Sequence, residues 1–497
     1  MNRLFYGDNL EVLRRDIKDE SVDLVYIDPP FNSKRNYNMI YTNVGKEDKA
    51  QAQAFVDTWT WDDLANEGLN AIKANYNRVF TRQSIDLIIG LEKVLGRGTL
   101  LAYLVSITLR IAEIHRVLKP TGSFYLHCDP TASHYLKLVL DAVFCPSGGE
   151  IRNEIIWGYS RMAAKGQKQL SRCHDVIFWY SKSNKWIFNV DDIRLPYSEK
   201  SKARAGYKKT NLGGGKPKSE ICELNEIGKF PEDWIQIPFI RGNEYLGYAT
   251  QKPEALLERF IKASSNEGDV IMDCYCGCGT SVAVAQRLGR QWIGVDITYQ
   301  SISLIFRRLA FNFGLEILDG IVLGGIPMDF ESAVELAHKK DDRVRKEFEK
   351  WMVLTYSRNM ALVNDKKGGD GGIDGVAYIL DRNEEGVDED KQVIFSVKSS
   401  EKLTPAVVRE LNGTVEREGA VRGILLTLYR FENLVKESKQ YGNYENKFLN
   451  THFRKIEVIC VQDILEGACL NMATSLEVLK KAEFKQKGRQ GELGLGE

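Results

Sequence analysis

A short stretch near the start of the chain combines a predicted strand with residue types that could hold an amine. Residues 22–27 are mostly apolar and include β-branched side chains, which predicts a buried strand. Asp28, Pro29, Pro30 and Phe31 follow it directly. The carboxylate of Asp28 can accept one N–H of an exocyclic amine and the carbonyl of Pro29 the other, while Phe31 offers a face on which a ring can stack. The nitrogen lone pair would then be free to attack an electrophile, although a plain strand followed by a tight turn has the same pattern.

A second stretch, much later in the chain, has the pattern of a nucleoside-binding turn. Asp273 ends an apolar run, Gly277, Gly279 and Thr280 follow it, and the next apolar run ends at Asp296. This order predicts strand, glycine-rich turn, helix and strand, in which the glycines let the backbone approach a ligand and Asp296 accepts ribose hydroxyls. Since no lysine follows the turn to hold phosphates, the pattern favours a nucleoside without phosphates, namely S-adenosylmethionine.

The elements between these stretches are expected to bring them together. Helices are predicted at 106–118 and 133–144, and strands at 123–127, 151–157 and 176–180. Such a run is typical of a doubly wound α/β sheet, in which ligands bind at the carboxyl ends of the strands where the strand order reverses. We therefore expect the strand before Asp28 and the strand that ends at Asp273 to be neighbours.

Together and in this order, the two stretches resemble the amino-methyltransferases of DNA, and more narrowly the permuted β-group, in which D-P-P-[YF] precedes the cofactor loop. The resemblance covers roughly residues 1–310. Further matching segments are Tyr6-Gly7-Asp8-Asn9, 116–123, His127-Cys128-Asp129-Pro130, 153–157, 174–177 and Thr250-Gln251-Lys252-Pro253.

The resemblance implies a fold, a reaction and further site residues. The fold is a Rossmann-like α/β methyltransferase sheet with permuted motif order, and a methyl group passes from S-adenosylmethionine to a base of double-stranded DNA. D-P-P in this family favours the N6 amine of adenine, with the N4 amine of cytosine as the alternative. The family places Asp8 near the adenine of the cofactor and Thr250 and Lys252 at its methionine end, although Asp8 could equally cap the following helix. No metal is expected in this domain, and flipping of the target base is implied.

A basic segment lies inside the region where this family recognises its DNA site, here about residues 181–247. Residues 200–218 contain no acidic residue and seven basic ones: Lys200, Lys202, Arg204, Lys208, Lys209, Lys216 and Lys218. A basic loop suits contact with phosphates, although a solvated surface loop would look alike. Residues 32–75 are polar and aromatic. The resemblance implies that they form a mobile loop over the target base, and the alternative, for Trp59 and Trp61, is a small aromatic core.

The last third of the chain predicts a second, smaller α/β domain at 335–470. A charged helix is expected at 333–351, a strand at 393–398 and a helix at 405–413. Asp374, followed by a hairpin and then by Ser396 and Lys398, resembles the restriction-endonuclease branch of the PD-(D/E)XK nuclease fold.

That nuclease fold needs two acidic groups to hold Mg²⁺ and a lysine that acts on the attacking water. Asp374 and Lys398 match, but Ser396 stands where an acid or glutamine is expected. Three acids could replace the missing ligand: Glu347, Glu349 and Asp370. An active nuclease, an inactive nuclease fold that binds DNA, and an unrelated glycine-rich turn all remain open.

Composition agrees with a globular chain of more than one domain. The 497 residues are 43% hydrophobic and 27% charged with a formal net charge of zero, so that any DNA-binding surface must be local. There is no apolar run long enough for a membrane span and no signal-peptide pattern, and the nine cysteines suit reduced thiols, so we expect a cytoplasmic protein. The domains are expected at 1–320 and 335–470, with a disordered tail at 471–497. A homodimer and a partner restriction subunit remain open.

Overall fold

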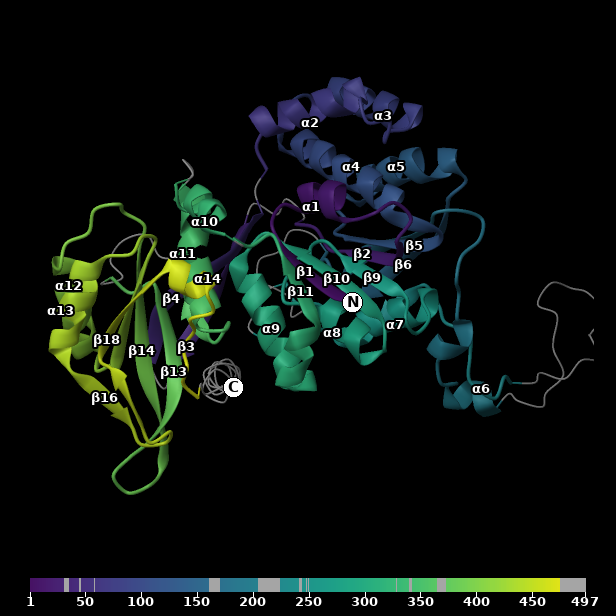
Figure 1. The fold of residues 1–497 in the computed structure, drawn as a ribbon. Helices are drawn as coiled ribbons and strands as arrows, with labels where there is room; N and C mark the ends of the chain where they lie inside the picture. The colour runs from purple at the N-terminus through teal and green to yellow at the C-terminus, as the bar shows by residue number, and fades with distance from the viewer. Residues whose placement is uncertain are drawn as a thin grey trace, which may run out of the picture.

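The larger of two main sheets contains the N-terminal strand and both predicted site strands (Figure 1). The computed structural model describes residues 1–30, 35–43, 46–57, 59–160, 170–203, 224–240, 244–246, 248, 250–327, 329–338, 342–363 and 372–473. The larger sheet has nine strands in the order β11-β1-β10-β9-β2-β5-β7-β6-β8. They are β1 (Asn2–Tyr6), β2 (Val22–Ile27), β5 (Leu118–Cys128), β6 (Glu150–Gly158), β7 (His174–Ser181), β8 (Trp234–Gln236), β9 (Val270–Asp273), β10 (Gln291–Asp296) and β11 (Ile321–Gly324).

The first six strands in that spatial order, β11 to β5, run parallel. Strand β7 is antiparallel to both of its neighbours, β5 and β6. From β2 the chain continues to β5 on one side, whereas β9 leads to β10 on the other, so the strand order reverses between β2 and β9. The two strands pair directly, although about 245 residues separate them. The expected Rossmann-like sheet with permuted motif order, and the expected neighbourhood of these strands, are thereby confirmed.

Helices cover both faces of this sheet (Figure 1). One face carries α1 (Asn9–Asp16), α2 (Asp63–Ala74), α3 (Arg82–Leu95), α4 (Thr99–Val117) and α5 (Ser133–Phe144), and the other carries α7 (Glu254–Ser264), α8 (Thr280–Arg287) and α9 (Tyr299–Phe313). Strand β2 shows why its sequence is apolar throughout: Val25 and Ile27 belong to the first core, and Leu24 and Tyr26 to the second.

The smaller sheet lies in the C-terminal third and has five strands in the order β12-β13-β14-β15-β18. They are β12 (Ala361–Val363), β13 (Gly375–Arg382), β14 (Asp388–Lys398), β15 (Arg422–Thr427) and β18 (Ile456–Cys460). One face packs against α10 (Phe330–Ala337), α11 (Asp342–Tyr356) and α14 (Val461–Leu465), and the other against α12 (Ala406–Glu418) and α13 (Glu432–Ser438). This is the expected smaller α/β domain.

Short elements complete the described chain. Two separate two-stranded sheets are formed by β3 (Arg35–Asn43) with β4 (Lys46–Asp57) and by β16 (Asn443–Asn446) with β17 (Thr451–Arg454). The remaining helices are α6 (Glu199–Ala203) and the 3₁₀ turns η1 (Cys145–Ser147), η2 (Val190–Ile193), η4 (Leu315–Gly320) and η5 (Lys439–Tyr441). In the described parts of the chain, every helix is too short or too polar to cross a bilayer.

Three predicted helices have different limits in the structure. The helix expected at 333–351 is two helices, because α10 ends at Ala337 and α11 begins at Asp342. The helix expected at 405–413 continues to Glu418, since the glycine in the left-handed conformation that ends it is Gly419 and not Gly413. The helix expected from Ser106 begins at Thr99. Of the expected tail, residues 474–497 lie outside the described residues, and the domain limits 1–320 and 335–470 stay predictions.

Candidate active site

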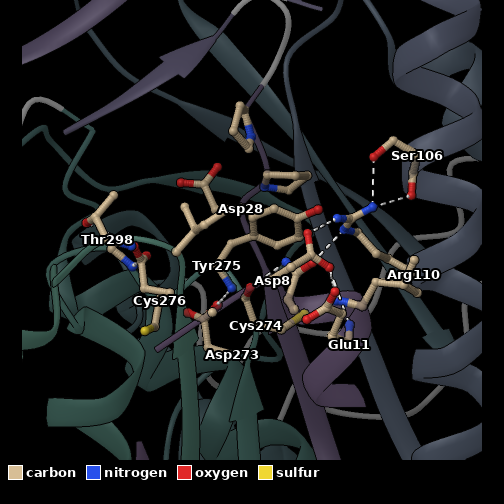
Figure 2. Close-up of a pocket in the computed structure, with 18 of the residues that line it drawn as sticks. Asp8, Glu11, Asp28, Ser106, Arg110, Asp273, Cys274, Tyr275, Cys276 and Thr298 are labelled. Carbon is tan, nitrogen blue, oxygen red and sulfur yellow. Dashed lines mark hydrogen bonds and ion pairs between the residues drawn. The ribbon is translucent and has the colours of Figure 1, made fainter. Parts of the chain in front are cut away.

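Four aspartates at the carboxyl ends of parallel strands line one cavity of about 1460 Å³. They are Asp8 after β1, Asp28 after β2, Asp273 at the end of β9 and Asp296 at the end of β10. Figure 2 shows Asp28 in the middle of this cavity, with Thr298 on one side and Arg110 on the other. The cavity is further lined by these predicted site residues: Pro29, Pro30, Thr250, Lys252, Gly277 and Thr280. Phe31 lies outside the described residues.

Asp28 and Lys252 form an ion pair between residues 224 positions apart in the chain. The side chains are only 16% and 12% exposed. Lys252 Nζ donates to Oδ2 of Asp28, whereas Oδ1 is buried and accepts no hydrogen bond within the part of the chain that is described. A buried carboxylate oxygen without a donor is costly. Asp28 therefore presents one acceptor to the cavity that a ligand N–H would satisfy.

The turn after β9 is held by buried contacts at both of its ends. Asp273 accepts hydrogen bonds from the backbone of Tyr275 and from the hydroxyl of Ser281, and burial raises its pKa to about 7. Gly279 ends the turn in the left-handed conformation, with φ of +72°, and is the residue from which α8 begins. A Cβ at this position would lie 2.6 Å from Cγ1 of Ile305. Glycine is therefore required both by the dihedral angle and by this close approach.

Asp296 is fixed by backbone groups on both sides of the turn. Its Oδ2 accepts the N–H of Gly277 at 2.9 Å, and its Oδ1 accepts the N–H of Thr298 at 3.1 Å. Burial raises the pKa of Asp296 to about 6. This carboxylate at the end of a parallel strand is well placed to accept the hydroxyls of a ribose.

Asp8 caps the helix that follows it and also lines the cavity. Its Oδ1 accepts the N–H of Leu10 at 2.8 Å and caps α1, and its Oδ2 is 2.7 Å from Nη2 of Arg110. Arg110 is also held by the hydroxyl of Ser106 (Figure 2). The structure thus places the capping carboxylate at the wall of the same cavity.

The charge of the cavity suits a cationic nucleoside. Asp28, Asp273 and Asp296 are acids close enough for Asp28 and Asp296 each to raise the pKa of Asp273 further. A phosphate group would add negative charge to this cluster, whereas a sulfonium would be attracted by it. The charges of the residues that line the cavity therefore fit S-adenosylmethionine.

Some residues of the cavity were not predicted from the sequence. Arg110 was missed, although a charged side chain within the apolar run of α4 is a usable signal. Ile297 lines the cavity, directly follows Asp296 and is 58% exposed, so it offers an apolar face beside the ribose position. Lys346 and Glu347, from α11 of the C-terminal domain, also line it, and no sequence motif indicates them.

Trp59 and Trp61 pack against a core, as the second of the two interpretations of their sequence predicted. Both are partly buried and pack against the core under α1 to α5, and the ring of Trp59 meets that of Tyr103 edge-on at 5.6 Å. Trp59 also lines the cavity. Of the basic segment, Lys200 and Lys202 both lie on α6 and are exposed. The other five residues lie outside the described ranges: Arg204, Lys208, Lys209, Lys216 and Lys218.

The nuclease-like residues come together only in part. Oδ2 of Asp374 accepts the backbone N–H of Val397 at 2.7 Å and faces the hydroxyl of Ser396 at 3.4 Å. Lys398 follows Ser396 by two residues on β14 and so points to the same face of the sheet. Glu347 is bonded elsewhere, to Lys350 and to α9. No group of three His, Cys, Asp or Glu side chains suited to a metal occurs among the described residues, and Asp370 lies outside them.

Comparison with known families separates the two parts of the chain. Residues 22–307, more than half of its length, match a family described as DNA methylase of the N6/N4 type. The chain belongs to this family. Residues 344–449 match a family described as restriction endonuclease. This member is therefore an amino-methyltransferase joined to a restriction-endonuclease-like domain.

Three DNA methyltransferases are among the proteins to which the chain is similar. DNA adenine methyltransferase YhdJ of Escherichia coli strain K12 is 26% identical over 307 residues, covering 62% of this chain and 82% of that protein. Type II methyltransferase M.HpaI of Haemophilus parainfluenzae is 31% identical over 210 residues, covering 42% of this chain and 60% of that protein. A solved structure, the cytosine-N4-specific PvuII DNA methyltransferase, aligns with 16% identity and a TM-score of 0.36, covering 65% of this chain and 94% of that one.

Proposed function

We propose that this DNA methylase transfers a methyl group from S-adenosylmethionine to the N6 amine of adenine in double-stranded DNA. The observation that supports it most is the position of Asp28, which ends β2 beside the cofactor strand β9 and keeps one buried carboxylate oxygen without a donor. An exocyclic amine would supply that donor. The name of the relative YhdJ supports adenine, as does the D-P-P sequence.

The proposed chemistry needs orientation more than bond-making by the protein. Oδ1 of Asp28 accepts one N–H of the amine and the carbonyl of Pro29 the other, so that the lone pair points into the cavity. The bound cofactor supplies a methyl group on a positively charged sulfur. When the nitrogen lone pair takes up the methyl group, the sulfonium would become a neutral thioether and positive charge would develop on the nitrogen. The carboxylate of Asp28 would stabilise that charge and then accept one N–H proton. Lys252 holds the other oxygen of the same carboxylate in place when no amine is bound.

DNA contact is proposed for the region 181–247, in which Lys200 and Lys202 are exposed. Exposed lysines of this kind can neutralise phosphates and hold the duplex while the base enters the cavity. Flipping is needed because the N6 amine takes part in base pairing. We expect the protein to act in the cytoplasm, where its DNA substrate lies.

The test is mass spectrometry of DNA nucleosides from cells that lack other methylation and express this chain. N6-methyladenine with wild type but not with Asp28→Ala is expected. N4-methylcytosine instead would keep the geometry and overturn the base, and this is the competing proposal within the family. Binding of S-adenosylhomocysteine to Asp28→Ala is the matched control, because Asp296 and the turn are untouched in that variant.

A second activity, DNA cleavage by the C-terminal domain, is favoured by the contact between Asp374 and β14 and by Lys398 on the same face. The described residues supply one carboxylate there and do not by themselves form a Mg²⁺ centre. Incubation of the protein with unmethylated DNA and MgCl₂ tests this. Cutting that disappears in Asp374→Ala and in Lys398→Ala supports a restriction–modification fusion, whereas cutting that persists in both places the activity elsewhere.

A further inference from the structure

Helix α11 of the restriction-endonuclease-like domain reaches the cofactor cavity of the methylase domain. Three of its side chains line that cavity: Lys346, Glu347 and Lys350. They adjoin the proposed ribose position, because Glu347 contacts Tyr299, three residues after Asp296. A part of the chain outside the DNA methylase match thus forms one wall of the site.

Glu347 links α11 to two elements of the methylase sheet. Its Oε2 accepts the backbone N–H of Tyr299, the first residue of α9, at 3.3 Å. Glu347 also lies near the hydroxyl of Tyr6 at the end of β1, because burial and then the negative charge of Glu347 raise the pKa of that hydroxyl. The rings of Tyr6 and Tyr299 stack with centroids 3.8 Å apart. One carboxylate from a different domain therefore bonds to the start of α9 and lies beside the end of β1.

The same two elements position Asp296. Tyr6 is the strand partner of Asp296 in the pairing of β1 with β10. Thr298 caps α9 through its side chain and donates its N–H to Oδ1 of Asp296 at 3.1 Å. The first turn of α9 is thus fixed by Asp296 at Thr298 and by Glu347 at Tyr299, so a shift of α11 would be transmitted to Asp296 through consecutive residues.

The contact is built from charges that are mostly removed from water. Nζ of Lys350 lies 2.7 Å from Oε1 of Glu347, and the two side chains are 8% and 14% exposed. If one member of such a pair is neutralised, the other stays charged and largely buried without an ionic partner. This costs far more stability than the loss of an ion pair at the surface. The position of α11 is therefore sensitive to the charge of Glu347.

We propose that α11 completes the cofactor site, with Glu347 as a positioning residue for Asp296, and that cofactor binding is coupled to the arrangement of the restriction-endonuclease-like domain. The inference rests on the proposed binding of S-adenosylmethionine at this cavity. Coupling is reciprocal: if α11 in place strengthens binding, the bound nucleoside must hold α11 in place by the same factor.

Two measurements on the full-length protein test this, with S-adenosylhomocysteine as the probe. The first is calorimetric binding to wild type, Glu347→Gln and Glu335→Gln, the last being the same change at an exposed position on α10. Glu347→Gln is expected to raise the Kd about tenfold, within the usual range of coupling between sites, while Glu335→Gln leaves it unchanged. The second is hydrogen exchange of wild type, in which saturating probe should slow exchange of the 342–356 segment.

The outcomes separate this inference from the proposed function. Binding to wild type with no slowing in α11, and an equal Kd for the two variants, would overturn the coupling and leave the methylase proposal standing. A wild-type protein that does not bind the probe at all would overturn both. Slowed exchange in α11 is also the readout that a merely destabilising substitution cannot imitate, because it is measured on the unchanged chain.

Discussion

Replacement of Gly279 by alanine should destabilise the cofactor turn, which joins β9 to α8, much more than the same change at Gly289 destabilises its own turn. Both glycines have φ of +72°, where an L-residue costs about 1–2 kcal/mol. At Gly279 the new Cβ would also lie 2.6 Å from Cγ1 of the buried Ile305, and such overpacking adds about 1–3 kcal/mol. At Gly289 the nearest atom, at 3.0 Å, is Cγ of Glu267, a side chain that can move away.

The strained backbone dihedral is common to both variants. The difference between their free energies of unfolding therefore measures the close contact at Gly279 alone. About 1–3 kcal/mol corresponds to roughly 1.5–4.5 °C in the melting temperature of a domain of about 320 residues, because the entropy of unfolding is about 2.1 cal/mol/K per residue. Differential scanning calorimetry of both full-length variants measures it, and titration with S-adenosylhomocysteine should show weaker binding in Gly279→Ala only. Equal melting temperatures, or a larger loss in Gly289→Ala, would refute the reasoning that packing against α9 shapes this turn.

The remaining predictions concern pH, salt and metal. Binding of S-adenosylhomocysteine should weaken as the pH falls through about 6, because protonation of Asp296 removes the charged acceptor, and calorimetry between pH 5 and 8 would reveal no such trend if the ribose is held elsewhere. Lys200→Glu combined with Lys202→Glu should reduce the slope of log binding constant for duplex DNA against log salt by about 2, whereas an unchanged slope would place the duplex elsewhere. Cleavage that depends on Mg²⁺ should vanish in both Asp374→Ala and Lys398→Ala, and gel analysis of plasmid DNA would expose any cutting that survives.

The core of the site could be predicted from the sequence because parallel strands expose their last residues at one edge. Asp28, Asp273 and Asp296 each end an apolar run, so their meeting follows once the runs share a parallel sheet. Gly279 was predictable for a similar reason, since the turn before α8 needs a left-handed residue. At the three aspartates and at Gly279, the residue type that the local sequence pattern indicates is also the one that the overall fold needs.

Long-range contacts could not be predicted in this way. The ion pair of Lys252 with Asp28 joins residues 224 apart, and Glu347 reaches Tyr299 from another domain. Neither contact is marked by a repeating pattern in the sequence around its residues. The break between α10 and α11 was missed because no glycine or proline marks it, and Gly413 was mistaken for a helix end although glycine is tolerated inside α12.

The central claim is that Asp28 orients a DNA base amine for methylation beside the cofactor turn. The most direct measurement is quantification of modified nucleosides by mass spectrometry in DNA from cells expressing wild type or Asp28→Ala. The account predicts N6-methyladenine with wild type and none with Asp28→Ala, while the variant still binds S-adenosylhomocysteine. Full methylation by Asp28→Ala would contradict it, because the reaction would then proceed without the carboxylate to which the orientation of the amine is assigned.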